Sequence, residues 1–151
     1  MNPLVQKMIF FSTMLADGYQ LRLRVTGVSM SPFLETGSYV TLSKIPLPEL
    51  KIGDIIFCRC DDGSFKLHRL ISIENDRLIT KGDALGLPDK PFEKDAYQGK
   101  VIRIEYLRSH AVIIRNMELW SVRAINYLIA LYFRFKLYLI SQYFRFKSNS
   151  A

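Results

Sequence analysis

Short segments in which apolar and polar residues alternate fill the middle of the chain, from about residue 20 to residue 105. Residues 20–25 are a clear example, because strict alternation is the pattern of a strand with one buried face. Glycine, proline, aspartate and asparagine gather between the segments and favour turns there. Short strands with frequent turns predict antiparallel pairing in a curled sheet or partial barrel. The expected strands are residues 20–25, 39–42, 55–59, 65–73, 77–80 and 99–105.

The N-terminal segment 3–16 is expected to be a helix, which ends at the turn signal Asp17-Gly18. Its apolar patch is much shorter than the roughly 20 residues that cross a bilayer. A secretory signal peptide is the alternative to a helix lying on the domain. We favour the helix, because no pattern of small residues for signal cleavage follows.

The C-terminal part of the chain has a different composition. It is rich in leucine, isoleucine, tyrosine and phenylalanine, carries interspersed arginine and lysine, and contains no acidic residue after Glu118. Its longest uncharged run, residues 124–133, is about half of a spanning length. We predict one long helix, or two helices broken near Arg134. Such a helix suits a membrane surface or a partner protein; the alternative is packing on its own domain or on a second copy, with arginine stems covering apolar surface.

The net charge of +7 favours anionic partners such as lipid head groups, nucleic acid or acidic proteins. No nucleic-acid-binding motif accompanies the basic residues, so nucleic acid is not an expected partner. Cys58 and Cys60 would share one face of a strand and are predicted to be reduced thiols. With so few candidate ligands, neither a metal nor another cofactor is expected. We expect a cytoplasmic or peripherally membrane-associated protein, because no clear transmembrane span is present in the sequence.

Candidate chemistry centres on Ser29 and His68, with Asp83 and Asp89 following in a loop. A serine hydroxyl becomes a useful nucleophile when a neighbouring base takes its proton. Histidine titrates near neutrality and suits that task, and a carboxylate can fix the orientation of its ring. The structural alternatives are a hydrogen-bonded core histidine, and aspartates that bond their own backbone in turns.

Lys66 is a rival for the role of the base, because it would lie on the same strand face as His68. A lysine serves as a base only after its pKa falls by several units, whereas an ordinary histidine needs little change. His68 is therefore the energetically easier choice.

Several of these segments together resemble type I signal peptidases and their LexA-like relatives. Residues 27–34 resemble the box of the nucleophile, residues 51–56 the next box, and residues 68–71 the box of the general base. Residues 80–83, followed by Asp89, resemble the final box. The base position carries histidine, as in the branch found in archaea, the endoplasmic reticulum and some Gram-positive bacteria.

The resemblance implies a role for each matched residue. Ser29 would be the acylating nucleophile, and His68 the general base and later the acid. Asp89 is the preferred orienting carboxylate, while Asp83 would support the site and is the alternative for that role. The backbone N–H of Ser29 would help to bind the oxyanion.

The implied activity is that of a serine endopeptidase that cleaves extended signal or leader peptides after a small residue. The alternative is a non-catalytic or self-processing peptide-binding member of the same fold, acting in peptide maturation or export. Family members normally carry an N-terminal membrane span; none is seen here, and the C-terminal segment is suited to the docking role. The expected organisation is an N-terminal helix over 1–18, a catalytic domain over 19–115 and a basic amphipathic helical segment over 116–151.

Overall fold

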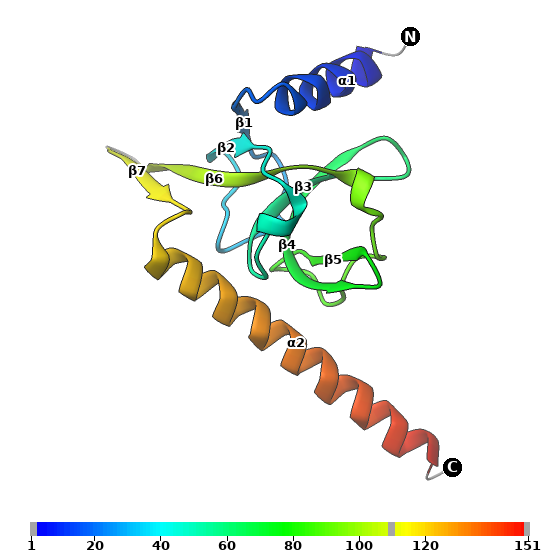
Figure 1. Cartoon of the computed structure of the whole chain (residues 1–151). Coiled ribbons are helices and arrows are strands. Elements are labelled where there is room, and N and C mark those ends of the chain that lie inside the picture. The colour runs from blue at the N-terminus through cyan, green and yellow to red at the C-terminus, as the bar shows by residue number, and fades with distance from the viewer. Residues whose placement is uncertain (1–2, 109–110, 150–151) are drawn as a thin grey trace.

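The computed structural model describes residues 3–108 and 111–149, and its centre is a seven-stranded antiparallel sheet (Figure 1). The strand order is β1-β2-β6-β3-β4-β5, and β7 pairs with β6. The predicted mainly antiparallel α+β class is confirmed, and the sheet is open, because no pairing joins β1 to β5 among the described residues. The strands are β1 (Leu21–Arg24), β2 (Tyr39–Ser43), β3 (Ile55–Arg59), β4 (Phe65–Glu74), β5 (Arg77–Lys81), β6 (Tyr97–Arg108) and β7 (Ala111–Asn116).

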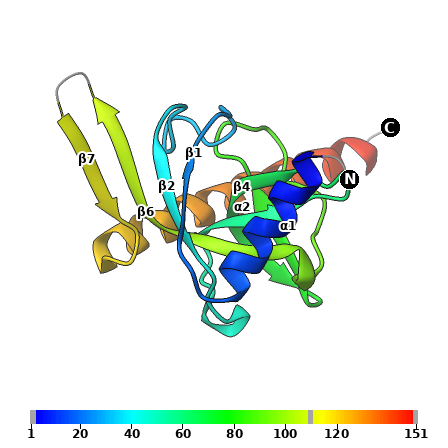
Figure 2. The same ribbon diagram turned by 90° about the horizontal axis from the view of Figure 1, so that it is seen from above.

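All six strands expected from the sequence are present, with small shifts at their ends. β7 was missed, because the sequence has no glycine, proline, asparagine or aspartate between residues 106 and 115 to signal a turn. Its residues Val112, Ile113 and Ile114 are all exposed. Figure 2 shows that β7 and the C-terminal end of β6 project from the rest of the sheet. Two short 3-10 turns, Leu47–Glu49 and Lys94–Ala96, complete the fold.

Two helices lie on opposite sides of the sheet, as Figures 1 and 2 show. α1 (Pro3–Ala16) is the predicted N-terminal helix; it contacts β1 and β6 and places Leu15 in the core. α2 (Trp120–Asn149) is one continuous helix, so the alternative break near Arg134 is wrong. α2 contacts β4. Within the described residues, neither helix combines the length and the apolar character that crossing a membrane requires.

Strand β3 is buried on both faces, which explains why it is an apolar run instead of an alternating segment. Ile55 and Phe57 join the cluster that contains Leu15, while Ile56 and Cys58 join a second cluster on the other face. Cys58 and Cys60 are free thiols, and burial raises the pKa of Cys58 to about 12. Because His68 in β4 pairs with the fully buried Ile56, the histidine lies beside the second cluster.

Gly53 lets α2 approach the turn before β3 very closely. Its backbone is in the left-handed region, with φ +99°, and a Cβ added there would lie 2.6 Å from the backbone of Asn126. Any side chain at this position would therefore collide with α2, and would also be strained by the backbone angle. Glycine at position 53 thus allows α2 to pack closely against this turn.

Candidate active site

Ser29 lies in the loop between β1 and β2, where tight turns hold the backbone on both sides of it. The N–H of Ser31 donates to the carbonyl of Val28 at 3.0 Å, and the N–H of Leu34 donates to the carbonyl of Met30 at 2.9 Å. Met30 and Leu34 are buried in the core and anchor the loop. Ser29 itself is only half-buried. The sequence thus places a reachable hydroxyl on a well-anchored backbone.

His68 bridges Ser29 and Asp89. Its Nε2 lies 3.0 Å from the Ser29 hydroxyl, and its Nδ1 lies 2.5 Å from Asp89 Oδ2. The imidazole side chain is 6% exposed. Because an ionised carboxylate only accepts hydrogen bonds, the contact favours the proton on Nδ1 and leaves Nε2 free to accept from the hydroxyl. The structure therefore brings together three of the four residues selected from the sequence.

The Asp89 carboxylate accepts hydrogen bonds from three side chains. Besides His68, Thr80 Oγ1 donates to Oδ2 at 2.6 Å and Lys66 Nζ donates to Oδ1 at 3.0 Å. Burial alone would raise the pKa of Asp89, but the hydrogen bonds from His68, Thr80 and Lys66 outweigh it and lower the pKa to about 2. The carboxylate is therefore ionised at neutral pH and can stabilise a positively charged imidazole.

Lys66 takes part in the site as an ion-pair partner. Burial alone would lower the pKa of its ammonium, but the hydrogen bond and charge of Asp89 outweigh that effect and raise the pKa. The side chain is 38% exposed. A lysine that holds its proton more firmly than usual is poorly suited to act as a base, so the geometry favours His68 over Lys66 for that task.

Asp83 does not contact His68 and is paired with Arg69 instead. The Arg69 guanidinium donates to both Asp83 oxygens, at 2.9 Å and 2.6 Å. It also donates to the carbonyl of Gly53 at 3.1 Å and to Asn126 Oδ1 at 2.7 Å. The Arg69 side chain is fully buried. Of the two candidate carboxylates, Asp89 orients the imidazole, and Asp83 ties the following loop to β4 and α2.

Sequence reasoning missed Thr80 and Asn126 as members of this network. Thr80 belongs to the fourth motif, and a threonine in β5, far along the chain from the serine, carries no chemical signal of its own. Asn126 is a polar residue within an otherwise apolar stretch of α2, and it is 4% exposed. A lone polar residue on an apolar helix face is a usable signal of a buried hydrogen bond.

Gly82 and Ala84 lie against the backbone carbonyl of Ser29. The N–H of Ala84 donates to the carbonyl of Ser29 at 2.9 Å. A Cβ added to Gly82 would lie 2.7 Å from that same carbonyl oxygen. Among the described residues, no backbone or side-chain acceptor takes the N–H of Ser29. The loop of the fourth motif therefore packs against the serine, and its glycine provides the space.

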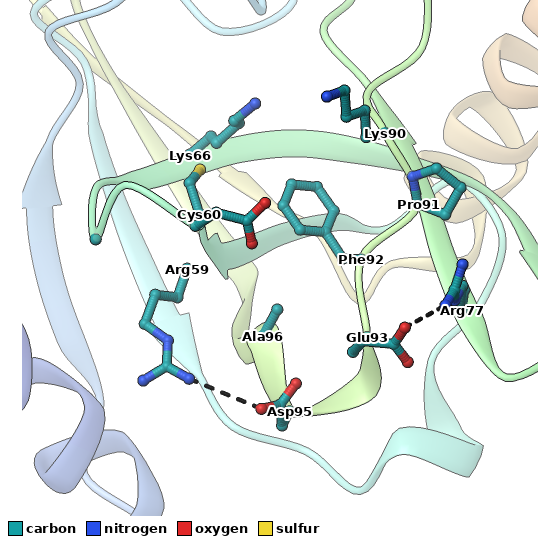
Figure 3. A pocket seen from close by; sticks show the side chains of 12 residues that line it. Arg59, Cys60, Lys66, Arg77, Lys90, Pro91, Phe92, Glu93, Asp95 and Ala96 are labelled. Atoms are coloured by element: carbon teal, nitrogen blue, oxygen red, sulfur yellow. Dashed lines mark ion pairs between the residues drawn. The ribbon is translucent and has the colours of Figure 1, made fainter.

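Lys66 lines two cavities. The smaller, about 260 Å³, contains Ser29 and lies between residues 23–27 and residues 65–67. The larger, about 920 Å³, is lined by charged side chains and is shown in Figure 3. Its lining includes two ion pairs, Arg59 with Asp95 and Arg77 with Glu93. Of the residues of the candidate site, Ser29 and Lys66 line the smaller cavity.

No model of a known protein family matches this chain, and no curated protein matches it either. The interpretation of the site therefore depends on its own geometry, together with the resemblance of its motifs. A serine, a histidine and a carboxylate in hydrogen-bonded order can carry out acyl transfer.

Proposed function

We propose that this protein is a serine endopeptidase of the signal-peptidase type, with the histidine form of the catalytic base. The observation that supports the proposal most strongly is the hydrogen-bonded series Ser29, His68 and Asp89, drawn from three separate parts of the chain. The order of the four motifs along the sequence supports it independently. Structural histidines are common, but a structural histidine has no need of a half-exposed serine on one nitrogen and an ionised aspartate on the other.

In the proposed reaction, His68 Nε2 takes the hydroxyl proton while Ser29 Oγ attacks the carbonyl carbon of the peptide bond. Asp89 stabilises the resulting imidazolium, and stays ionised because its own pKa is about 2. The tetrahedral intermediate collapses when His68 gives the proton to the departing amine. Water then attacks the acyl-enzyme, again with His68 as the base, and releases Ser29.

The N–H of Ser29 is the donor on this chain best placed to stabilise the oxyanion. It has no internal acceptor among the described residues, and it belongs to the residue that forms the new bond. A donor of this kind is worth about 3 kcal/mol in the transition state. The hydrogen bond from Ala84 to the carbonyl of Ser29 fixes the orientation of the loop backbone that presents it.

The smaller cavity supports an extended peptide as the substrate. Its walls are formed by residues 23–27, at the end of β1, and residues 65–67, at the start of β4. β1 pairs with β2 along one edge only among the described residues, so a peptide strand could pair with its second edge near the cavity. At about 260 Å³ the cavity is small, which fits a small side chain beside the cleaved bond.

The proposal is tested by labelling and cleavage with a matched pair of variants. A serine-directed fluorophosphonate probe is applied to the wild type, Ser29→Ala and Ser31→Ala, and peptides with small residues are followed by mass spectrometry. We expect labelling and cleavage by the wild type and by Ser31→Ala, which lacks only a nearby hydroxyl, and neither with Ser29→Ala. Circular dichroism confirms that each variant is folded. Cleavage by Ser29→Ala at the wild-type rate would overturn the assignment of Ser29 as the nucleophile. A folded wild type that neither labels nor cleaves would favour the non-catalytic peptide-binding alternative.

A further inference from the structure

The helix α2 has two apolar faces, and only one of them packs against the protein. The inner face carries Asn126, Ala130 and Phe133, which are buried. The other face carries a row of exposed apolar side chains, here called the outer stripe. The outer stripe consists of Ile125, Leu128, Tyr132, Phe135, Leu139 and Tyr143, each between 49% and 63% exposed.

The spacing of the outer stripe shows that it is a single continuous surface. Its members follow one another at intervals of three or four residues, which places them along one side of a helix. Leu128 lies midway between the buried Asn126 and Ala130, and two residues correspond to about 200° of helical rotation. The outer stripe therefore points away from the sheet. An exposed apolar surface of this extent is unusual for a protein that keeps it in water.

Exposed cations border the outer stripe. They flank it on both sides, and α2 contains no aspartate or glutamate. These flanking cations are Arg134, Lys136, Arg145 and Lys147. The only tryptophan of the chain, Trp120, begins the helix and is 82% exposed. An apolar stripe rich in aromatic side chains and bordered by lysine and arginine has the composition of a helix lying in a lipid interface.

We propose that the outer stripe docks on an anionic lipid bilayer, with the axis of α2 parallel to the membrane surface. The aromatic and aliphatic side chains would enter the boundary between head groups and acyl chains. The flanking cations would reach the lipid phosphates with their apolar stems still covered. The 30 residues of α2 would form a contact about 45 Å long.

A second copy of the chain suits the outer stripe less well. Pairing two α2 helices through this surface would bring the flanking cations of one helix near those of the other. Since α2 has no acidic residue, nothing on either helix would compensate for the repulsion. An anionic bilayer supplies the missing negative charge, and this complementarity decides in its favour.

The inner face keeps α2 attached while the outer stripe is free to dock. Asn126 accepts a hydrogen bond from the buried Arg69, and the Lys81 ammonium lies 3.9 Å from the ring centre of Phe133. Substitutions on the outer stripe therefore leave these contacts intact. The docking proposal does not depend on the proposed peptidase activity, since Ser29→Ala should bind lipid as the wild type does.

The experiment measures binding of the full chain to vesicles of phosphatidylcholine alone or mixed with phosphatidylglycerol. Flotation gives the bound fraction, and the emission of Trp120 reports entry into lipid. We expect binding to the anionic vesicles, with a blue shift of the emission, and much weaker binding to the neutral ones or at high salt. The stripe variant is Leu128→Gln, Phe135→Gln and Leu139→Gln. The cation variant is Arg134→Gln, Lys136→Gln, Arg145→Gln and Lys147→Gln.

The stripe variant should lose vesicle binding, and the cation variant should bind at least about tenfold more weakly, since each cation near such a surface contributes up to roughly fivefold. Two control variants remove the same kinds of side chain elsewhere and should bind as the wild type does. The apolar control is Ile9→Gln, Ile73→Gln and Leu87→Gln. The cation control is Arg59→Gln, Arg77→Gln, Lys90→Gln and Lys94→Gln.

Three outcomes would overturn the proposal. The first is a folded wild type that does not bind anionic vesicles. The second is equal loss of binding in a variant and its matched control, because binding would then follow overall charge or hydrophobicity. The third is that the wild type forms a dimer in sedimentation equilibrium, that the stripe variant is a monomer, and that vesicles do not change the dimer. The outer stripe would then be covered by a second copy of the chain. Circular dichroism and thermal unfolding show that each variant keeps the fold.

Discussion

Lys66 and Asp89 form an ion pair through Asp89 Oδ1, while Oδ2 of the same carboxylate contacts His68. The two side chains that could act as a base therefore share one acid. The shared carboxylate raises the pKa of the Lys66 ammonium, which is already charged at neutral pH. The ion pair holds a proton on Lys66, and this leaves the imidazole as the group that can accept one from Ser29.

Replacing Lys66 by methionine separates the two candidate bases. We expect Lys66→Met to keep cleavage within about fivefold of the wild type, since a partly exposed ion pair is worth up to about 1 kcal/mol. His68→Ala should abolish cleavage. Steady-state kinetics on one peptide compare the two variants. A loss with Lys66→Met as complete as the loss with Ser29→Ala would show that lysine is the base.

The stability of the protein should depend on pH through Asp89. Its pKa is about 2 in the folded state, below the ordinary value, so its ionised form stabilises the fold above about pH 4. That contribution is lost as the pH falls through the folded value. We expect the free energy of unfolding to rise by on the order of 2 kcal/mol from pH 2 to pH 4 through this group. Urea denaturation should show a shallower rise in Asp89→Asn, and an unchanged rise would contradict the assignment.

Breaking the ion pair between Arg69 and Asp83 should be costly. Arg69 is fully buried, so Asp83→Asn leaves a charge without its partner, and we expect a loss of about 3 kcal/mol in the free energy of unfolding. The exposed pair of Arg22 with Glu105 is a matched control, and Glu105→Gln should lower the free energy of unfolding far less than Asp83→Asn does. Chemical denaturation measures both variants. Equal losses would mean that burial of the guanidinium is unimportant.

Gly82 is the position at which a single methyl group should disturb the nucleophile. A Cβ there would lie 2.7 Å from the carbonyl of Ser29, so the serine loop has to move. We expect Gly82→Ala to lower kcat/KM by about 100-fold, the effect of a misplacement of about 1 Å in an active site. Gly86→Ala provides the control, because nothing lies within 4 Å of a Cβ at that position. Comparable losses in the two variants would point to loop flexibility and away from a clash.

Much of the sheet could be predicted because its strands have distinct patterns. Residues 20–25 alternate, and residues 55–59 form an apolar run between turn signals, so both were recognised as strands. β7 follows β6 without such a signal, and its exposed apolar residues do not alternate. A strand that is held by backbone hydrogen bonds and buries few side chains does not need an alternating pattern, so it is hard to recognise from the sequence.

The sequence identified the residue types of the candidate site, but it could not distinguish between similar residues that could fill the same role. Asp83 and Asp89 have the same chemistry and lie in the same loop, so spacing alone cannot say which of them meets His68. The choice is made by long-range contacts. Thr80 and Lys66 gather around one carboxylate, and Arg69 takes the other. Those partners come from β4 and β5, and their convergence on the two carboxylates is a property of the folded chain.

Successive residues of β4 serve two different parts of the molecule. His68 reaches the serine, while Arg69, one peptide unit further, reaches across to Asn126 on α2. Chemistry and helix attachment therefore share a single stretch of backbone. We expect a substitution that loosens the attachment of α2 to shift the imidazole as well, so the packing of this helix and the geometry around the nucleophile are mechanically connected.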